Sequence, residues 1–257
     1  MEIGFASGAR RAPVLPASGR GVERRLEVGL EHALGSPRLH LRRTDSTNDR
    51  ARELARRGAP HGTLVTAGEQ AAGRGRQGRI WAAPPGLALL CSLVIRGPQP
   101  LLSLAAGVAV AEAVGRQARL KWPNDVLLDG RKVAGILVEG CPQERWAVLG
   151  IGVNVALREE DLPSELRAKA GSLGLAPEAI EPVLERLLGC LGRWTAAGAP
   201  AVLDAVRTRD ALLGERVRFA GGEDGEGVGA GVDGEGRLVV ISGGRPLALC
   251  AGEVHLA

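Results

Sequence analysis

The chain has 257 residues, of which 45% are hydrophobic and 24% are charged, and its net charge is +4. This composition is sufficient for one large domain or for a medium domain with a smaller one. No apolar stretch approaches the ~20 residues of a membrane-spanning helix, and the N-terminus lacks the continuous hydrophobic run of a secretory signal. We therefore expect a soluble, cytoplasmic protein with no membrane partner.

Lysine is scarce in a chain that is rich in arginine. Of the 33 basic residues only three are lysines, namely Lys121, Lys132 and Lys169. Two of these, Lys121 and Lys132, lie close together in the sequence. Because the ammonium group is a compact point charge that a guanidinium does not replace, this pair predicts a site that requires a localised positive charge.

The four cysteines, Cys91, Cys141, Cys190 and Cys250, lie far apart in the sequence. They form no C-x-x-C motif and have no nearby pair of histidines, so neither a zinc cage nor a disulfide framework is indicated. We expect all four to be buried as small hydrophobic side chains.

Residues 1–37 are rich in Gly, Ala, Pro and Arg, and we interpret them as an N-terminal extension with one short helix over 22–34. The extension is too short for a helix-turn-helix domain with its own core. A strand over 39–43 then leads into the sequence DSTN (45–48). Ser46 followed by Asp49 resembles a helix N-terminal cap, and Gly58 is expected to end that helix.

The middle of the chain alternates strands with helices, which predicts an α/β (α+β) domain with helices packed on a mixed sheet. An Asp129-Gly130 pair marks a tight hairpin turn. The expected strands cover residues 63–67, 87–95, 126–128, 132–139 and 146–155, with a further strand starting at 119. The expected helices run from Pro98 to about 118, over 177–197 and over 202–213.

The last 43 residues change character, because glycine becomes frequent and short alternating strands replace helices. Strands are expected over 216–220, 228–232, 237–241 and 253–256. We predict a small β module that begins near Gly214.

Residues 73–79 read GRGRQGR and match the G-x-G-x-x-G pattern of dinucleotide-binding turns. The context contradicts this interpretation: the preceding strand ends near Ala67, Pro84-Pro85-Gly86 prevents a long helix after the loop, and no acidic residue lies about 20 residues further on. The glycines and arginines instead suit an anionic ligand such as phosphate. A solvated basic loop is the alternative, and the scarcity of aromatic residues disfavours a nucleic-acid patch.

The segment 121–140, KWPNDVLLDGRKVAGILVEG, groups polar side chains at a strand end. Lys121, Asn124 and Asp125 surround Pro123, and the hairpin turn brings Lys132 back toward them, so both lysines can reach one pocket. The alternative to a ligand site is that these residues are purely structural, with Asp125 ending a strand and Lys132 belonging only to the hairpin. In LGIGVNV (149–155), the glycines indicate a close approach by a ligand or by another backbone, or a simple bulge, and Asn154 offers a donor and an acceptor.

Four segments in this order resemble the biotin protein ligases, also called biotin acetyl-CoA carboxylase synthetases. They are DSTNDRA (45–51), EQAAGRGRQGRIW (69–81), KWPNDVLLDGRKVAGILVEG (121–140) and LGIGVNVA (149–156). The resemblance covers about residues 38–257. It implies a catalytic domain over 38–213 and an SH3-like β-barrel over 214–257.

The resemblance also implies a two-step reaction. Biotin and MgATP give biotinyl-5'-AMP and pyrophosphate, and a lysine of a biotin carboxyl carrier protein then attacks the mixed anhydride. The residues implied to contact biotin are Ser46, Thr47, Gln70, Gly73, Arg74, Lys132 and Gly135. Those implied to face the nucleotide are Arg76, Arg79, Trp81, Lys121, Asn124 and Asn154.

The chemistry explains these residue types, because attack of a carboxylate on the α-phosphate brings two anions together and requires converging cations. We assign catalytic roles to Arg76, Lys121, Asp125 and Lys132. Lys132 is expected at the junction of carboxylate and α-phosphate, and Asp125 is expected to orient magnesium or the incoming amine. A glycine loop that orders over the adenylate, with Arg76 as its latch, would exclude water.

Two departures from the family pattern affect these expectations. The run 82–88 reads AAPPGLA, so Ala83 and Ala88 are expected to remove a polar contact beneath the biotin site. Residues 1–37 do not provide a DNA-binding domain, so we expect no specific nucleic-acid partner, while the question of a homodimer stays open.

The alternatives to a biotin ligase are a lipoate or octanoate ligase of the same superfamily and a DNA-binding, biotin-responsive regulator. The C-terminal module is expected to support nucleotide or acceptor docking, or to be purely structural.

Overall fold

The computed structural model of the chain describes residues 34–97, 99–162, 164–220 and 224–256. Nearly all of the helix expected over 22–34, and most of the N-terminal extension, lies outside these residues. In the described part of the chain, no helix is both long and apolar enough to cross a membrane.

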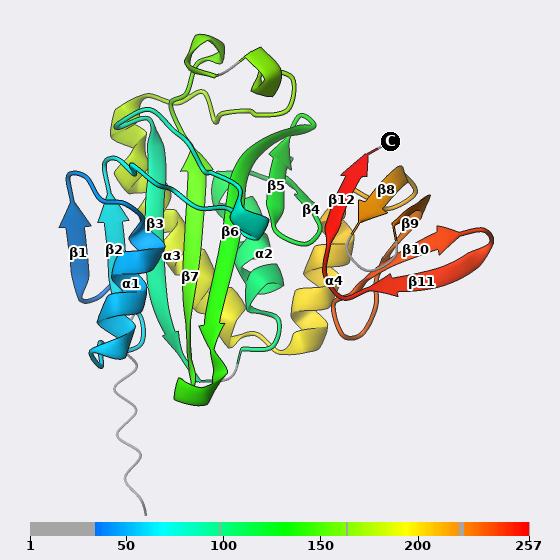
Figure 1. Cartoon of the computed structure of the whole chain (residues 1–257), viewed down its shortest axis with the longest axis horizontal. Helices are drawn as coiled ribbons and strands as arrows, with labels where there is room; N and C mark the ends of the chain where they lie inside the picture. The colour runs from blue at the N-terminus through cyan, green and yellow to red at the C-terminus, as the bar shows by residue number, and fades with distance from the viewer. Residues whose placement is uncertain (1–33, 98, 163, 221–223, 257) are drawn as a thin grey trace, which may run out of the picture. The chain divides into compact units, whose positions relative to one another are not determined.

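A seven-stranded mixed sheet forms the larger part of the structure (Figure 1). Its order is β1-β2-β3-β7-β6-β5-β4; β1 and β2 are parallel, and the other neighbours are antiparallel. The strands are β1 (Arg38–Leu41), β2 (Leu64–Ala67), β3 (Ala88–Arg96), β4 (Arg119–Lys121), β5 (Asp125–Leu128), β6 (Arg131–Cys141) and β7 (Trp146–Asn154). The α/β class predicted from the sequence is confirmed.

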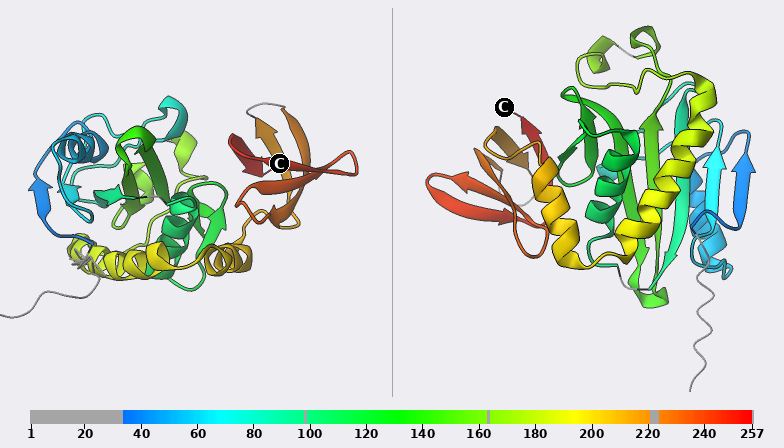
Figure 2. Two further views of the ribbon diagram at one scale, coloured as in Figure 1. Left: turned by 90° about the horizontal axis from the view of Figure 1, so that it is seen from below. Right: turned by 180° about the vertical axis from the view of Figure 1, so that it is seen from behind.

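Helices cover both faces of this sheet, α1 on one face and α2 and α3 on the other (Figures 1 and 2). The helices are α1 (Thr47–Arg56), α2 (Leu102–Val114), α3 (Ile180–Ala196) and α4 (Ala199–Arg209). Short 3-10 turns occur at η1 (Arg76–Gly78), η2 (Pro142–Glu144), η3 (Glu159–Asp161), η4 (Ser164–Leu166) and η5 (Pro177–Ala179).

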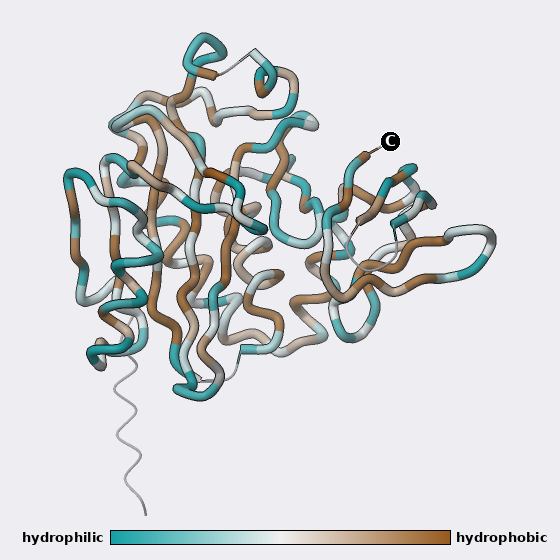
Figure 3. The backbone as a smooth tube through the Cα atoms, in the orientation of Figure 1, coloured by the Kyte–Doolittle hydropathy of each residue, from teal (hydrophilic) through white to brown (hydrophobic). Residues whose placement is uncertain are grey.

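Side chains that alternate along the central strands fill two separate cores. Val65 and Val94 pack toward α1, whereas their neighbours Leu64 and Leu93 join the large core beneath α2 and α3. Since β3 is buried on both faces, its sequence is an almost unbroken apolar run (Figure 3) rather than an alternating one.

The hairpin between β5 and β6 has the turn that the sequence predicts. Asp129 has φ 50° and Gly130 has φ 75°, and two consecutive positive φ values characterise the type I′ turn that favours Asp-Gly. The predicted helix end at about residue 118 is wrong, because α2 stops at Val114. Gly115, with φ 142°, breaks it there.

A second, five-stranded antiparallel sheet has the order β11-β10-β9-β8-β12, consistent with the predicted SH3-like module. Its strands are β8 (Arg216–Ala220), β9 (Gly225–Val232), β10 (Leu238–Ser242), β11 (Arg245–Leu249) and β12 (Glu253–Leu256). β11 is absent from the sequence-based expectation, because Pro246 lies in it and two glycines with positive φ precede it. The indole N–H of Trp122 donates to the Gly236 carbonyl, 3.0 Å away, and ties the two sheets together.

The expectation that all four cysteines are buried is wrong for two of them. Cys91 and Cys190 are buried, as predicted. Cys141 is half-buried at the end of β6, and Cys250 is exposed in the turn between β11 and β12. Both lie at strand ends, where packing on the sheet faces is incomplete.

Candidate functional site

A pocket lies between the glycine loop (residues 73–81), the middle of β6 and β7, the β4–β5 turn and the start of β12. Its cavity volume is about 140 Å³. A second hollow, behind the β4–β5 turn, measures about 10 Å³, which is barely the space that one water molecule requires. The larger pocket is therefore the candidate ligand site.

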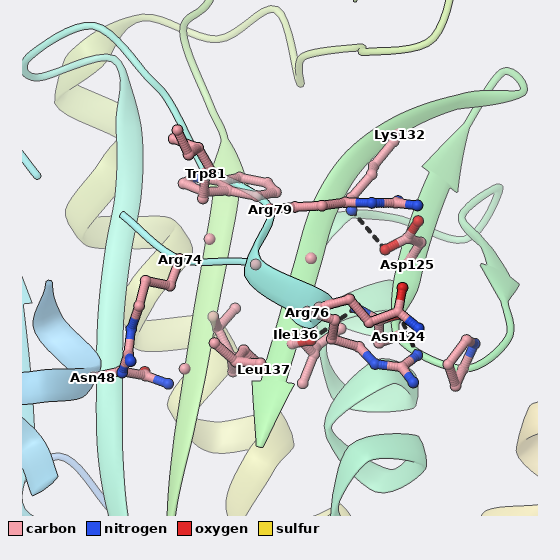
Figure 4. Close-up of a pocket in the computed structure, with 18 of the residues that line it drawn as sticks. Asn48, Arg74, Arg76, Arg79, Trp81, Asn124, Asp125, Lys132, Ile136 and Leu137 are labelled. Atoms are coloured by element: carbon pink, nitrogen blue, oxygen red, sulfur yellow. Dashed lines mark hydrogen bonds and ion pairs between the residues drawn. The ribbon is translucent and has the colours of Figure 1, made fainter. Parts of the chain in front are cut away.

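Most of the residues singled out from the sequence line this pocket, although they come from four separate stretches of the chain. Those that line it are Ser46, Thr47, Gln70, Arg74, Arg76, Arg79, Trp81, Lys121, Asn124, Asp125, Lys132 and Gly135. Gly73 and Asn154 do not. In Figure 4 the side chains separate into a group around Asn48 and Arg74 and a group around Asn124, Asp125 and Lys132.

Uncharged polar groups gather at the start of α1. The backbone N–H and the hydroxyl of Thr47 both donate to Gln70 Oε1, at 2.8 and 3.0 Å. The side-chain NH₂ group of Gln70 is therefore the part that can donate hydrogen bonds to a ligand. Ser46 occupies the N-cap position as predicted, but its side chain caps no N–H. Ser46 is 2% exposed and lies in the wall of the pocket.

A buried network joins α1, the sheet and the glycine loop. The Ser92 hydroxyl donates to Asn48 Oδ1 at 2.6 Å, and Asn48 Nδ2 donates to Glu139 at 2.7 Å. The same Glu139 oxygen accepts from Arg74 at 2.8 Å. A Cβ on Gly150 would lie 2.1 Å from Asn48 Oδ1, so only glycine leaves room for the asparagine.

Two further glycines form a floor on which Trp81 lies. Gly135 on β6 pairs with Gly152 on β7, and Cβ atoms there would lie 2.9 and 2.5 Å from the indole ring. Lys132 Nζ is 5.5 Å from the ring centroid, within cation–π range. The glycines of LGIGVNV were expected to admit a ligand or another backbone, whereas side chains of this chain occupy the space over Gly150 and Gly152.

Positive charge gathers at the opposite end of the pocket. Lys132 Nζ lies 2.6 Å from Asp125 Oδ1, and Arg76 donates to Asn124 Oδ1 at 3.2 Å. The Asn124 amide is held by the Ile136 carbonyl at 2.9 Å. Figure 4 shows Arg79 extending toward the Lys132–Asp125 pair. The two lysines, as predicted, reach the same pocket.

Burial shifts the ionisation of two of these cations. It lowers the pKa of the Lys121 ammonium, and the Asp125 carboxylate opposes that shift. Burial likewise lowers the pKa of Arg76, again opposed by Asp125. Arg74 is paired with two carboxylates that do not line the pocket, and the four other lysines and arginines among its described lining residues share two carboxylates, Asp125 and Glu253. An anionic ligand would compensate the excess of positive charge.

The glycine loop folds back on itself rather than leading into a helix. Arg74 bridges Ile80, and Gly75 N–H donates to the Arg79 carbonyl at 2.7 Å. Its only helical turn is η1, where Gln77 and Gly78 have positive φ. The prediction that this is not a dinucleotide-binding turn is confirmed, because no helix begins at the loop.

The acidic partners of the loop come from distant parts of the chain. Arg74 lies 2.8 Å from both Asp49 and Glu139, and Arg79 forms an ion pair with Glu253 at the start of β12. The loop has no acidic residue of its own, as the sequence shows. Its conformation is therefore held by carboxylates from α1, β6 and the second sheet.

The two predicted residues outside the pocket have structural contacts. Asn154 is buried, and its side-chain amide donates to the Gly171 carbonyl at 2.8 Å, so it holds the 171–173 segment against β7. Gly73 lies behind Gln70, where a Cβ would be 2.3 Å from the Trp81 carbonyl oxygen. Ala83 and Ala88 pack with Leu90 and Leu157 in a small apolar cluster.

The described residues contain no group of three side chains able to hold a metal ion. Both carboxylates that line the pocket already have cationic partners, since Asp125 pairs with Lys132 and Glu253 with Arg79. The pocket therefore supplies no cage for a divalent ion. An ion that arrives on phosphate oxygens could still use one carboxylate.

Comparison with known proteins relates this geometry to a family. Residues 40–155 match the model of the biotin/lipoate A/B protein ligase family. The bifunctional ligase/repressor BirA of Bacillus spizizenii is 39% identical over 188 residues, which cover 67% of this chain and 58% of that protein. The biotin--[acetyl-CoA-carboxylase] ligase of Mycobacterium tuberculosis is 37% identical over 83% of this chain and 86% of its own length.

Solved structures agree with the sequence comparison. The biotin protein ligase from Aquifex aeolicus in complex with biotin and ATP has a TM-score of 0.73 and 25% identity, and the match covers 86% of this chain and 99% of that one. The four predicted motifs meet in one pocket on the same fold. The chain belongs to the biotin protein ligases.

Proposed function

We propose that this protein activates biotin with ATP as biotinyl-5'-AMP, releases pyrophosphate, and transfers the biotinyl group to a lysine of a biotin carboxyl carrier protein. The observation that carries the proposal is the division of one pocket into two ends. Uncharged hydrogen-bonding groups at Ser46, Thr47 and Gln70 suit the ureido ring of biotin, and the cations at the other end suit phosphates.

The apolar surface between the two ends suits the chain that joins the biotin ring to its carboxylate. Leu90 and Leu137 line it together with the ring of Trp81, which lies over Gly135 and Gly152. A carboxylate at the end of this chain would lie toward Lys132. Biotin would thus present its reacting oxygen to the cationic end.

In the first step the biotin carboxylate oxygen forms a bond to the α-phosphorus of ATP, and the bond from that phosphorus to the pyrophosphate oxygen breaks. Both reactants are anionic, so the step depends on cations that lower their repulsion. Lys132, held by Asp125, supplies one at the junction, while Lys121, Arg76 and Arg79 face the nucleotide. We propose magnesium as part of the MgATP substrate, with Asp125 as its only protein ligand.

An ATP–pyrophosphate exchange assay tests the proposal and its nearest alternative. With biotin, labelled pyrophosphate is expected to enter ATP. With lipoate or octanoate, which lack the ureido N–H groups that pair with the polar end, exchange is expected to stay near background. Exchange with lipoate or octanoate as rapid as with biotin would instead support the alternative activity within the superfamily.

We also propose that the protein acts without a specific nucleic-acid partner, although the Bacillus relative is named a ligase/repressor. Duplex binding that weakens steeply with salt would oppose this view, because such dependence reports neutralised phosphates. Binding should be measured with and without biotin and ATP.

Replacing Arg76 by glycine is expected to release the adenylate before the carrier protein arrives. Arg76 holds the loop to Asn124, and its loss exposes the reactive anhydride to water and to unrelated amines. Mass spectrometry of a mixture of the carrier and serum albumin should show albumin labelling at least about tenfold above wild type. Arg116→Gly, in an exposed turn after α2, is the control; equal selectivity in the two variants would contradict the latch.

A further inference from the structure

Glu253 places a carboxylate of the second sheet at the mouth of the pocket. It is the first residue of β12, and it lines the pocket together with Gly252, Val254 and His255. Its side chain pairs with Arg79 of the glycine loop, lies 3.2 Å from His255 Nε2, and is 27% exposed. A carboxylate in a site for an anionic ligand opposes binding through its own charge, so its presence requires an explanation.

The support beneath Glu253 is rigid. β12 pairs with β8 in a continuous register, Glu253 opposite Ala220, and the next side chain, Val254, is 3% exposed in the core. The second sheet is itself fixed to the larger one by the hydrogen bond from Trp122 to Gly236. Trp122 directly follows Lys121. Glu253 is therefore held in place relative to the cationic end of the pocket.

The loop is clamped at both ends by this arrangement. Arg74 is held by Asp49 and Glu139 near its start, and Arg79 is held by Glu253 near its end. Ile80, which directly follows Arg79, has a side chain that is 80% exposed and provides no anchor. Without Glu253, no other contact of a described acidic residue holds the Arg79 end.

We propose that Glu253 is a positioning residue: it fixes Arg79, and with it the glycine loop, over the nucleotide end of the pocket, so that the second sheet completes the active site. The kinetic part of this inference rests on the proposed function, whereas the loop contact does not. Two opposite outcomes separate positioning from a bystander charge. Glu253→Gln removes a negative charge beside Lys121 and Arg76. If Glu253 acts only through its charge, the variant should have a lower KM for ATP. If Glu253 positions the loop, the variant should have a higher KM for ATP.

Trypsin provides a test that needs no ligand, because it cleaves after arginine and Arg79 lies in the loop. The full-length Glu253→Gln variant without ligands is expected to be nicked after Arg79 about fivefold faster than wild type, the effect of losing a partly exposed ion pair. The cleavage site is identified by mass spectrometry. The matched control is Glu226→Gln, because Glu226 is an exposed residue of β9 that pairs with Arg218 on β8. This variant should be cleaved at the wild-type rate.

Glu253→Asp retains the charge but is shorter by one methylene, so it should fall between wild type and Glu253→Gln in cleavage rate and in KM for ATP. It also provides the test if Glu253→Gln does not fold. Wild-type cleavage in the variants would overturn the proposed contact. Faster cleavage with an unchanged or lower KM for ATP would overturn the positioning role. If the variant is cleaved faster but the wild-type protein shows no biotin-dependent exchange, the contact is upheld. That result would count only against the proposed function.

Discussion

Replacing Lys132 by alanine is expected to lower the rate of biotin-dependent pyrophosphate release by about 100- to 1,000-fold, the effect of losing one preorganised group that stabilises transition-state charge. Lys132 lies 2.6 Å from Asp125 and 5.5 Å from the Trp81 ring centroid, so its ammonium group is fixed before ligands bind. Removing it also leaves the Asp125 carboxylate without this cation beside the reacting anions. The fall should appear mainly in kcat, because the missing charge acts where the two anions meet.

Lys169→Ala provides the matched control for this experiment. Lys169 is the one lysine exposed on the surface, and only its backbone carbonyl is engaged with Lys132, accepting from the Lys132 N–H at 2.8 Å. The control should keep wild-type exchange. Normal pyrophosphate release by Lys132→Ala, measured under single-turnover conditions, would remove Lys132 from the reaction centre.

The Gly150→Ala variant is expected to lose biotin affinity and stability together. Its methyl group would lie 2.1 Å from Asn48 Oδ1, and Asn48 cannot move away without breaking its bonds to Ser92 and Glu139. We expect a loss of about 1–3 kcal/mol in the free energy of unfolding, the usual effect of overpacking a core. Because Asn48 neighbours Thr47, biotin affinity should fall by more than about tenfold.

Gly140→Ala tests whether these effects are specific to the site. Gly140 lies on β6, and no described atom lies within 4 Å of a Cβ built there. Its thermal unfolding and its biotin affinity, measured by calorimetry, should stay close to wild type. If Gly150→Ala bound biotin as tightly as Gly140→Ala does, the network around Asn48 would have no part in recognition.

The fold was largely predictable because local signals agreed with one another. The Asp129-Gly130 turn, the apolar run of β3 and the glycine that ends α1 each specify one conformation. The errors arise where local signals conflict with one another, as Gly115 does with the apolar pattern of α2, or with the pairing of strands, as in β11. α2 ends earlier than its apolar pattern suggests, and β11 contains Pro246, which a local reading excludes from a strand.

The site was predictable to the extent that its residues lie within continuous motifs. Thr47, Gln70 and Lys132 were identified in this way, and the pocket unites them. Asn48, Glu139 and Glu253 were not assigned a function, because their importance depends on which distant side chains they meet. A possible signal was present: a loop of arginines without local acids requires carboxylates from elsewhere in the chain.

The distribution of lysines gives the protein one property outside its own reaction. A mixed anhydride that escapes the pocket acylates amines, and guanidinium groups, which stay protonated, do not compete for it. Of the three lysines in the chain, two line the pocket and only Lys169 is exposed. An arginine-rich surface therefore protects the protein from its own reagent, and any self-labelling of lysine on the exterior should be confined to a single side chain.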